Sequence, residues 1–257
     1  MTDVLVCVKR VVDPTGKVTL SPDEQSIDGR YAGFTLSRHE ECAIELAVQV
    51  AKATDGSSTV VTLGDEDAEE QLRTALAMGV DAATHIVADS GLRGPADVAA
   101  ELAAVVTDHA ASGRVYGLVL LGNDAADSGD FQVGIRLAHE LGRPIVNGAN
   151  VAEIKDDHVV AFVKGPDGQE TYDVPLPAVV TVLEGGVEPR YPTIPGRMKA
   201  KRVTIEQRQP GTELIGPSRV RLRLPEPPPS QVQVLGTGAA AAGAVVDLLE
   251  TLGVLTR

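Results

Sequence analysis

STVVTLG at residues 58–64 is followed by DAEEQLRTALAMG at 67–79, and this change from an apolar run to a helical pattern recurs twice before residue 142. The later pairs are THIVAD (84–89) with ADVAAELAAVVTDHA (96–110), and YGLVLLG (116–122) with FQVGIRLAHELG (131–142). Strict alternation of strand and helix is typical of a mostly parallel sheet with helices on both faces. We therefore predict a doubly wound, Rossmann-like α/β fold.

The segment before this stretch adds a first strand and a first helix. DVLVCVK (3–9) is a short apolar run, and a turn-rich loop or hairpin follows it. SRHEECAIELAVQVAKAT (37–54) has apolar residues at helical spacing, and Ser37 is suited to be the N-cap residue. We expect a strand followed by a helix that begins after Ser37.

The second half of the chain changes character at residue 151. Residues 151–183 contain strands of alternating polarity, with a hairpin turn at 165–168 and a buried strand, PAVVTVL, at 177–183. They predict an antiparallel addition to the sheet. After Gly185 the chain is rich in Pro and basic residues, and PEPPPS (225–230) predicts an extended arm. We expect one domain over 1–225, and a C-terminal arm and helix over 226–257 that pack on a partner subunit.

The net charge of the chain disfavours some classes of binding partner. Its 257 residues carry a formal net charge of -13, which repels nucleic-acid phosphates and anionic lipid headgroups. The N-terminus has neither the features of a signal peptide nor an apolar run that could span a bilayer. We expect a cytoplasmic protein without nucleic-acid binding or direct membrane insertion.

The loops that follow strands are the candidate ligand sites, because ligands of open α/β sheets bind beyond the carboxyl ends of the strands. The richest in small residues is the loop at 122–130, which leads into a predicted helix from about Phe131. It could hold a phosphate, although an ordinary surface connection is the alternative. No nucleophile motif, acid/base pair or metal-ligand spacing occurs in the sequence. We therefore expect no catalytic residues and no metal.

A basic cluster at 190–202 stands out in this acidic chain. Its cationic side chains are interleaved with Tyr191, Ile194 and Met198. Such a mixture suits a transient docking surface, and a solvated loop is the alternative.

Several stretches together resemble the beta (small) subunit of the electron-transfer flavoproteins. They are VKRVVD (8–13), ECAIELAV (41–48), RTALAMGVD (73–81) and LPAVVT (176–181) followed by EPRYPTIPGRMKAK (188–201). The resemblance implies an adenine nucleotide-binding type of fold. It also implies a heterodimer whose alpha subunit carries most of the FAD contacts, while the beta subunit buries a structural AMP.

The resemblance also implies a set of nucleotide-binding residues. The phosphate would lie against the turn at 127–133, and the adenine between the first strand and the loop before the first helix. The implied set is Cys7, Ser37, Arg38, His39, Glu40, Leu63, Gly64, Gly122, Asn123, Asp124, Ala125, Ala126, Asp127, Ser128, Gly129, Asp130, Phe131, Gln132 and Val133.

By the same resemblance, residues 182–204 form a recognition loop that docks electron-donating dehydrogenases, with Ile194 as the apolar anchor. The implied docking residues are Arg190, Tyr191, Ile194, Met198, Lys199 and Lys201. The chain would then be a non-catalytic subunit that helps to pass electrons through FAD to a membrane or soluble acceptor.

Three alternatives remain open at this point. Family members that bifurcate electrons hold a second FAD in place of AMP, and the Gly129-Asp130 pair is nearer to their pattern. A nucleotide hydrolase or ligase could share the scaffold, but it would need a phosphate-activating motif. A nucleotide-sensing module without redox function would give a colourless complex.

Overall fold

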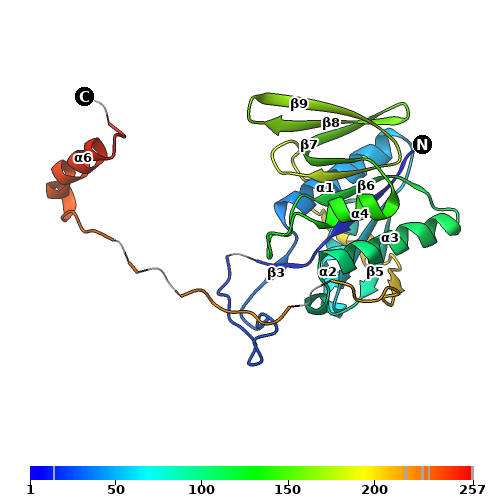
Figure 1. Cartoon of the computed structure of the whole chain (residues 1–257), viewed down its shortest axis with the longest axis horizontal. Helices are drawn as coiled ribbons and strands as arrows, with labels where there is room; N and C mark the ends of the chain where they lie inside the picture. Colours follow the sequence, from blue (N-terminus) through cyan, green and yellow to red (C-terminus); the bar gives the residue numbers. More distant parts are fainter. Residues whose placement is uncertain (14, 217–218, 227–228, 231, 256–257) are drawn as a thin grey trace. The chain divides into compact units, whose positions relative to one another are not determined.

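A nine-stranded sheet forms the centre of the chain in the computed structural model, which describes residues 1–13, 15–216, 219–226, 229–230 and 232–255 (Figure 1). Its strand order is β11-β5-β4-β1-β6-β10-β7-β8-β9. The strands are β1 (Asp3–Val8), β4 (Ser58–Gly64), β5 (Ala82–Val87), β6 (Tyr116–Gly122), β7 (Ile145–Lys155), β8 (His158–Gly165), β9 (Gly168–Pro175), β10 (Ala178–Val182) and β11 (Glu206–Arg208). A separate two-stranded ribbon pairs β2 (Val11–Val12) with β3 (Phe34–Thr35).

Neighbouring strands run parallel from β11 across to β7, and β7, β8 and β9 then pair antiparallel. In the centre, Val6 of β1 lies opposite Val60 of β4 and Leu120 of β6. The predicted α/β fold with an antiparallel addition is therefore confirmed. The hairpin is confirmed as well, because Gly165 pairs with Gly168 across its turn.

The two faces of the sheet carry separate hydrophobic cores. Val4 and Val6 of β1 pack with the helices α1 (Arg38–Ala53) and α2 (Glu69–Met78). Leu5 and Cys7 point the opposite way, because side chains alternate along a strand, and they pack with α3 (Pro95–Ala111) and α4 (Val133–Leu141). The strand β1 is therefore buried on both faces, as expected for the central strand of a doubly wound sheet.

Three elements differ from the expected boundaries. Helix α4 begins at Val133 and not near Phe131. Strand β7 begins at Ile145, and its first half pairs parallel with β10 before its second half pairs antiparallel with β8. Residues 186–208, for which the sequence predicts no helix or strand, form α5 (Ile194–Ala200), whose Ala200 is buried, and the edge strand β11. These elements depend on tertiary contacts that local sequence patterns do not carry.

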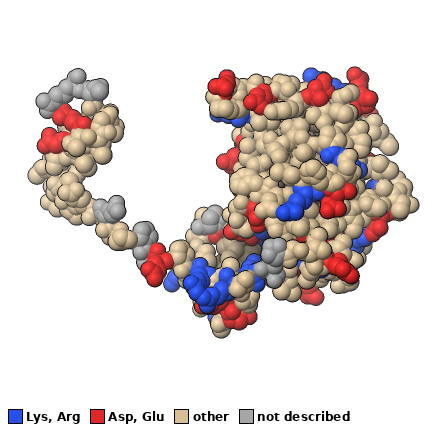
Figure 2. Space-filling model, in the orientation of Figure 1, with Lys and Arg blue, Asp and Glu red and all other residues tan. Residues whose placement is uncertain are grey.

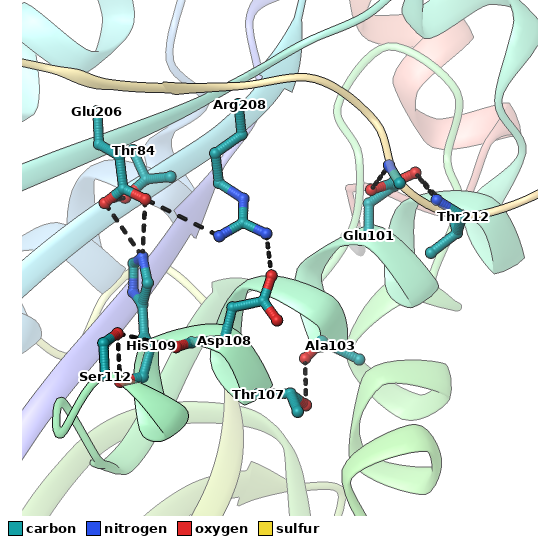
Figure 3. A network of polar contacts seen from close by, with 11 residues as sticks. Thr84, Glu101, Ala103, Thr107, Asp108, His109, Ser112, Glu206, Arg208 and Thr212 are labelled. Atoms are coloured by element: carbon teal, nitrogen blue, oxygen red, sulfur yellow. Dashed lines mark hydrogen bonds and ion pairs between the residues drawn. The ribbon is translucent and has the colours of Figure 1, made fainter.

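Helix α3 has a buried polar stripe that anchors the chain after β11. Glu206 of β11 accepts a hydrogen bond from His109 and lies near Arg208, which in turn pairs with Asp108 (Figure 3). Further along, the Glu101 carboxylate accepts the backbone N–H groups of residues 211 and 212 at 3.1 and 2.9 Å. The Asp97 carboxylate accepts those of residues 215 and 216 at 2.6 and 3.0 Å. We call residues 206–216 and 219–222 the strap.

The C-terminal residues form a second compact unit, Leu224–Arg257. Its described part contains a short 3-10 turn, Gly238–Ala241, and helix α6 (Ala242–Thr251), which buries none of its residues. Val245, Val246 and Leu248 are among the apolar side chains that α6 leaves exposed. Among the described residues, no helix is long and apolar enough to span a membrane.

We predict that the Asp97→Asn substitution lowers the free energy of unfolding by about 1–3 kcal/mol at pH 7, because a buried charged acceptor of three backbone N–H groups is lost. Burial favours the neutral acid, but hydrogen bonds from residues 215, 216 and 94 keep the pKa of Asp97 below its usual range. Its contribution is therefore present above the unfolded pKa of about 4 and is lost as the pH falls through the lower folded value.

Urea unfolding at pH 7 and at pH 3 measures this effect, with Glu70→Gln on the exposed face of α2 as the matched control. The difference between Asp97→Asn and the wild type should shrink at the lower pH. Equal stability of the two proteins at pH 7 would contradict the role of the stripe.

Candidate functional site

A cavity of about 500 Å³ lies beyond the carboxyl ends of β1, β4 and β6. Its floor contains Cys7, Leu63 and Leu121, one from each strand, and its walls come from residues 90–98 and 122–136. Strands β1 and β6 are neighbours although α1, β4, α2, β5 and α3 separate them in the chain, so the cavity lies at the topological switch point of the sheet. Its volume is in the range of small-molecule sites.

The start of α1 is fixed by a capping box, as the sequence predicts for Ser37. The Ser37 hydroxyl accepts the N–H of Glu40 at 3.3 Å, and the Glu40 carboxylate accepts the N–H of Ser37 at 2.8 Å. The second carboxylate oxygen accepts the N–H of Lys9 at 2.5 Å, which ties the end of β1 to the helix. Burial raises the pKa of Glu40 to about 7, although these hydrogen bonds act in the opposite direction.

Two side-chain contacts join the loop after β1, the loop after β6 and the start of α1 at this edge of the sheet. Lys9 Nζ lies 2.6 Å from the Asp127 carboxylate, and His39 Nδ1 lies 2.6 Å from the Asp124 carboxylate. The first pair links the loop after β1 to the loop after β6, and the second links that loop to α1. Asp127 is therefore paired with a lysine of the chain itself, and the Asp124 carboxylate lies against the His39 ring.

The loop after β6 is a preformed turn. The N–H groups of Ser128 and Gly129 both donate to the carbonyl of Ala125, at 3.1 and 2.7 Å. Gly129 has φ +65°, in the left-handed region that glycine adopts at little cost. At the start of the loop, Asn123 Oδ1 accepts the Thr181 hydroxyl at 2.6 Å, which anchors the loop to β10. Such a loop can bring backbone N–H groups close to an anion.

The structure brings many of the predicted nucleotide-binding residues to this cavity. Those that line it are Cys7, Glu40, Leu63, Gly122, Asn123, Asp124, Ala125, Ser128, Asp130, Gln132 and Val133. Those that do not line it are Ser37, Arg38, His39, Gly64, Ala126, Asp127, Gly129 and Phe131. Several residues of the second group contact residues of the first group: Ser37 forms a hydrogen bond with Glu40, and His39 contacts Asp124. Binding by any of them stays a prediction.

One wall of the cavity, the loop between β5 and α3, is not among the loops predicted as ligand sites. Ser90, Gly91, Arg93 and the first turns of α3 line the cavity there, together with Arg136 of α4 and Arg219 of the strap. The Gly94-Pro95 pair after a strand, with Asp97 three residues after Gly94, is a helix-start signal that could have identified this loop. Arg219 gives no such signal, because only the strap brings it to the cavity.

Cys7 is a poor nucleophile despite its position on the floor. Burial raises the pKa of the Cys7 thiol, so that the unreactive protonated form persists at neutral pH. The arrangement can bind and orient a ligand, and it presents no activated nucleophile at Cys7.

The predicted docking residues lie on and beside α5. Tyr191 is 85% exposed, Ile194 81% and Met198 55%, while Lys199 and Lys201 are also exposed. Arg190 differs, because its guanidinium forms a two-point ion pair with the buried Glu45 of α1 at 2.7 Å and so holds the loop to the domain. Helix α5 is fixed by Arg73, which donates to the carbonyls of Ala200 and Val203 at 2.6 Å. The exposed apolar side chains are thus carried by a helix and a loop that are held in place on the domain.

The chain is a doubly wound α/β protein with a cavity at the switch point of its parallel sheet, the place where proteins of this fold class bind their ligands. The family model for the electron transfer flavoprotein domain matches residues 27–212. Electron transfer flavoprotein subunit beta of Bacillus subtilis (strain 168) is 35% identical over 205 residues, covering 80% of this chain and 78% of that protein. The subunit beta of Homo sapiens is 34% identical over 212 residues, covering 81% of each chain. The chain belongs to the electron transfer flavoprotein beta-subunit family.

We predict that the Glu40→Gln substitution removes a pH dependence of stability. A carboxyl group with a folded pKa near 7 contributes stability that is present below its unfolded pKa of about 4.3 and is lost as the pH rises through about 7. From pH 5 to pH 8, the wild type should therefore lose roughly 1–3 kcal/mol of unfolding free energy relative to the variant.

Urea unfolding at several pH values between 5 and 8 measures this difference. Glu41→Gln is the matched control, since Glu41 pairs with Arg38 on the outer side of the same helix turn. Parallel pH profiles for the wild type and Glu40→Gln would show that Glu40 does not titrate in this range.

Proposed function

We propose that this chain is the nucleotide-holding, non-catalytic subunit of a heterodimeric electron carrier, in which an alpha subunit carries most of the FAD contacts. The observation that carries the proposal is the switch-point cavity, which is lined by the 122–133 loop that the family resemblance assigns to AMP. The protonated Cys7 thiol on its floor supports a binding role and not a chemical one.

In this proposal AMP is a structural ligand. The adenine lies near β1 and the start of α1, where Glu40 and Lys9 join the two elements. The phosphate lies against the preformed turn of the loop after β6, where the N-terminal end of α4 favours negative charge. A bound AMP would then connect three loops that belong to different strands.

The two exposed apolar surfaces take different partners in this proposal. The side chains of Tyr191, Ile194 and Met198 on the α5 loop dock the electron-donating dehydrogenases, with Lys199 and Lys201 steering an acidic partner. Helix α6, which buries nothing within its own unit, packs on the alpha subunit.

Co-expression with the alpha subunit tests the proposal, followed by acid release and mass spectrometry of the bound nucleotides. One FAD and one AMP per heterodimer are expected. Release of two FAD molecules and no AMP would mean that a second flavin occupies the cavity. The complex would then belong to the electron-bifurcating type. A complex without flavin would contradict the electron-carrier function.

We predict that Ile194→Ala slows electron transfer from a donor dehydrogenase about tenfold or more. An apolar anchor residue that becomes buried on docking typically contributes about 1–2 kcal/mol or more to the binding free energy. The flavin content and the free energy of unfolding should remain unchanged, since Ile194 is 81% exposed. Stopped-flow reduction of the bound flavin measures the rate.

Val115→Ala serves as the control, because Val115 is apolar and 60% exposed but lies before β6, outside the docking loop. The rate should be unchanged in this variant. If Ile194→Ala transferred electrons as fast as the wild type, the docking role of the α5 loop would be wrong.

A further inference from the structure

The strap returns the chain to the cavity after it has crossed α3. Its first half is held by the buried carboxylates of Glu101 and Asp97, and Figure 3 shows the Glu101 contact with Thr212. Its second half lies against the loop between β2 and β3, where Leu222 donates its N–H to the carbonyl of Glu24 at 2.8 Å and Gln25 Nε2 donates to the carbonyl of Val220 at 2.9 Å. The strap thus connects helix α3 to the loop between β2 and β3.

Arg219 lies where these contacts meet the cavity. Its backbone N–H donates to the carbonyl of Gly91 at 3.1 Å, and its guanidinium donates to the carbonyl of Gln25 at 2.6 Å. A Cβ atom on Gly91 would come within 3.0 Å of the guanidinium, so the absence of a side chain at Gly91 lets Arg219 lie close against this wall. Arg219 is one of the residues that line the cavity.

The cations of the cavity differ in how far their charge is neutralised. Lys9 pairs with Asp127, and Arg93 pairs with Glu101 at 3.2 Å. Within the described part of the chain, Arg219 and Arg136 have no carboxylate at ion-pair distance, and Arg136 donates only to the neutral side chain of Gln132. Figure 2 shows Lys and Arg side chains gathered on one edge of the domain, around the loop between β2 and β3, where Arg30 and Arg221 pair with Asp28 and Glu24. The cavity wall beside the strap therefore favours an anion.

We propose that Arg219 binds the phosphate of the nucleotide and that this contact couples occupancy of the cavity to the docking of the strap. The inference rests on the proposed nucleotide site and adds a residue that lies outside residues 27–212, the part matched by the family model. Arginine forms charge-assisted hydrogen bonds with phosphate, and Arg219 already keeps its backbone on the Gly91 loop. Coupling between two sites is reciprocal, so a docked strap must also strengthen phosphate binding.

Calorimetric titrations with AMP and with adenosine test the phosphate contact. They use the full chain in complex with its alpha subunit, freed of bound nucleotide. Arg219→Gln should weaken AMP binding about 10- to 100-fold and leave adenosine binding within about twofold, because only AMP carries the phosphate. Arg221→Gln is the matched control: Arg221 lies in the same strap but pairs with Glu24 and does not line the cavity, so its affinities should equal those of the wild type.

Hydrogen exchange of the strap tests the coupling. AMP should slow exchange of the amides at 211, 212, 215 and 216 in the wild type, and this protection should be lost in Arg219→Gln and with adenosine. Equal AMP affinity of the wild type and Arg219→Gln would overturn the inference while leaving the proposed function in place. An equal loss in Arg221→Gln, or unchanged exchange in the wild type, would also overturn it. A wild-type complex that binds no AMP would overturn this inference together with the proposed assignment of the cavity to AMP.

Discussion

The crossover that carries the chain from β5 past β4 and β1 to β6 is the constraint on which the site depends. Helix α3 makes this crossing on one face of the sheet, while α1 and α2 cover the other face. The loops after β1 and β6 therefore lead to helices on opposite faces, and a crevice remains between them. Cys7, Gly122 and the start of α3 meet there because of this topology, and no local motif is needed to place them.

Buried carboxylates on helices hold the irregular segments around this crevice. Glu40 accepts the N–H of Lys9, Glu45 accepts that of Arg190, and Asp97 and Glu101 accept those of the strap. All four side chains are at most 5% exposed. A buried N–H without a partner is costly, and a charged acceptor gives one of the stronger hydrogen bonds. The loop after β1, the docking loop and the part of the strap beyond β11 are thus fixed outside the main sheet.

Patterns that repeat within one element could be predicted from the sequence, whereas contacts between distant segments could not. The alternation at 58–142 predicts the parallel sheet, and Ser37 before an apolar helical pattern predicts the start of α1. The loop at 122–130 was recognised by its small residues. The spacing of Asp97 from Gly94 indicates a helix start, but no local pattern indicates that the buried carboxylates of Asp97 and Glu101 accept N–H groups of the strap. Arg219 reaches the cavity through the same long-range contacts, so its position carries no local signal.

The central claim is that the switch-point cavity holds an adenine nucleotide, and photolabelling with 8-azido-AMP tests it most directly. After irradiation of the complex, peptide mass spectrometry locates the attached nucleotide. The account predicts labelling within residues 7–9, 37–40, 90–98 or 122–133, and loss of the label when excess AMP is present. Labelling confined to other segments, or labelling that excess AMP does not reduce, would contradict it.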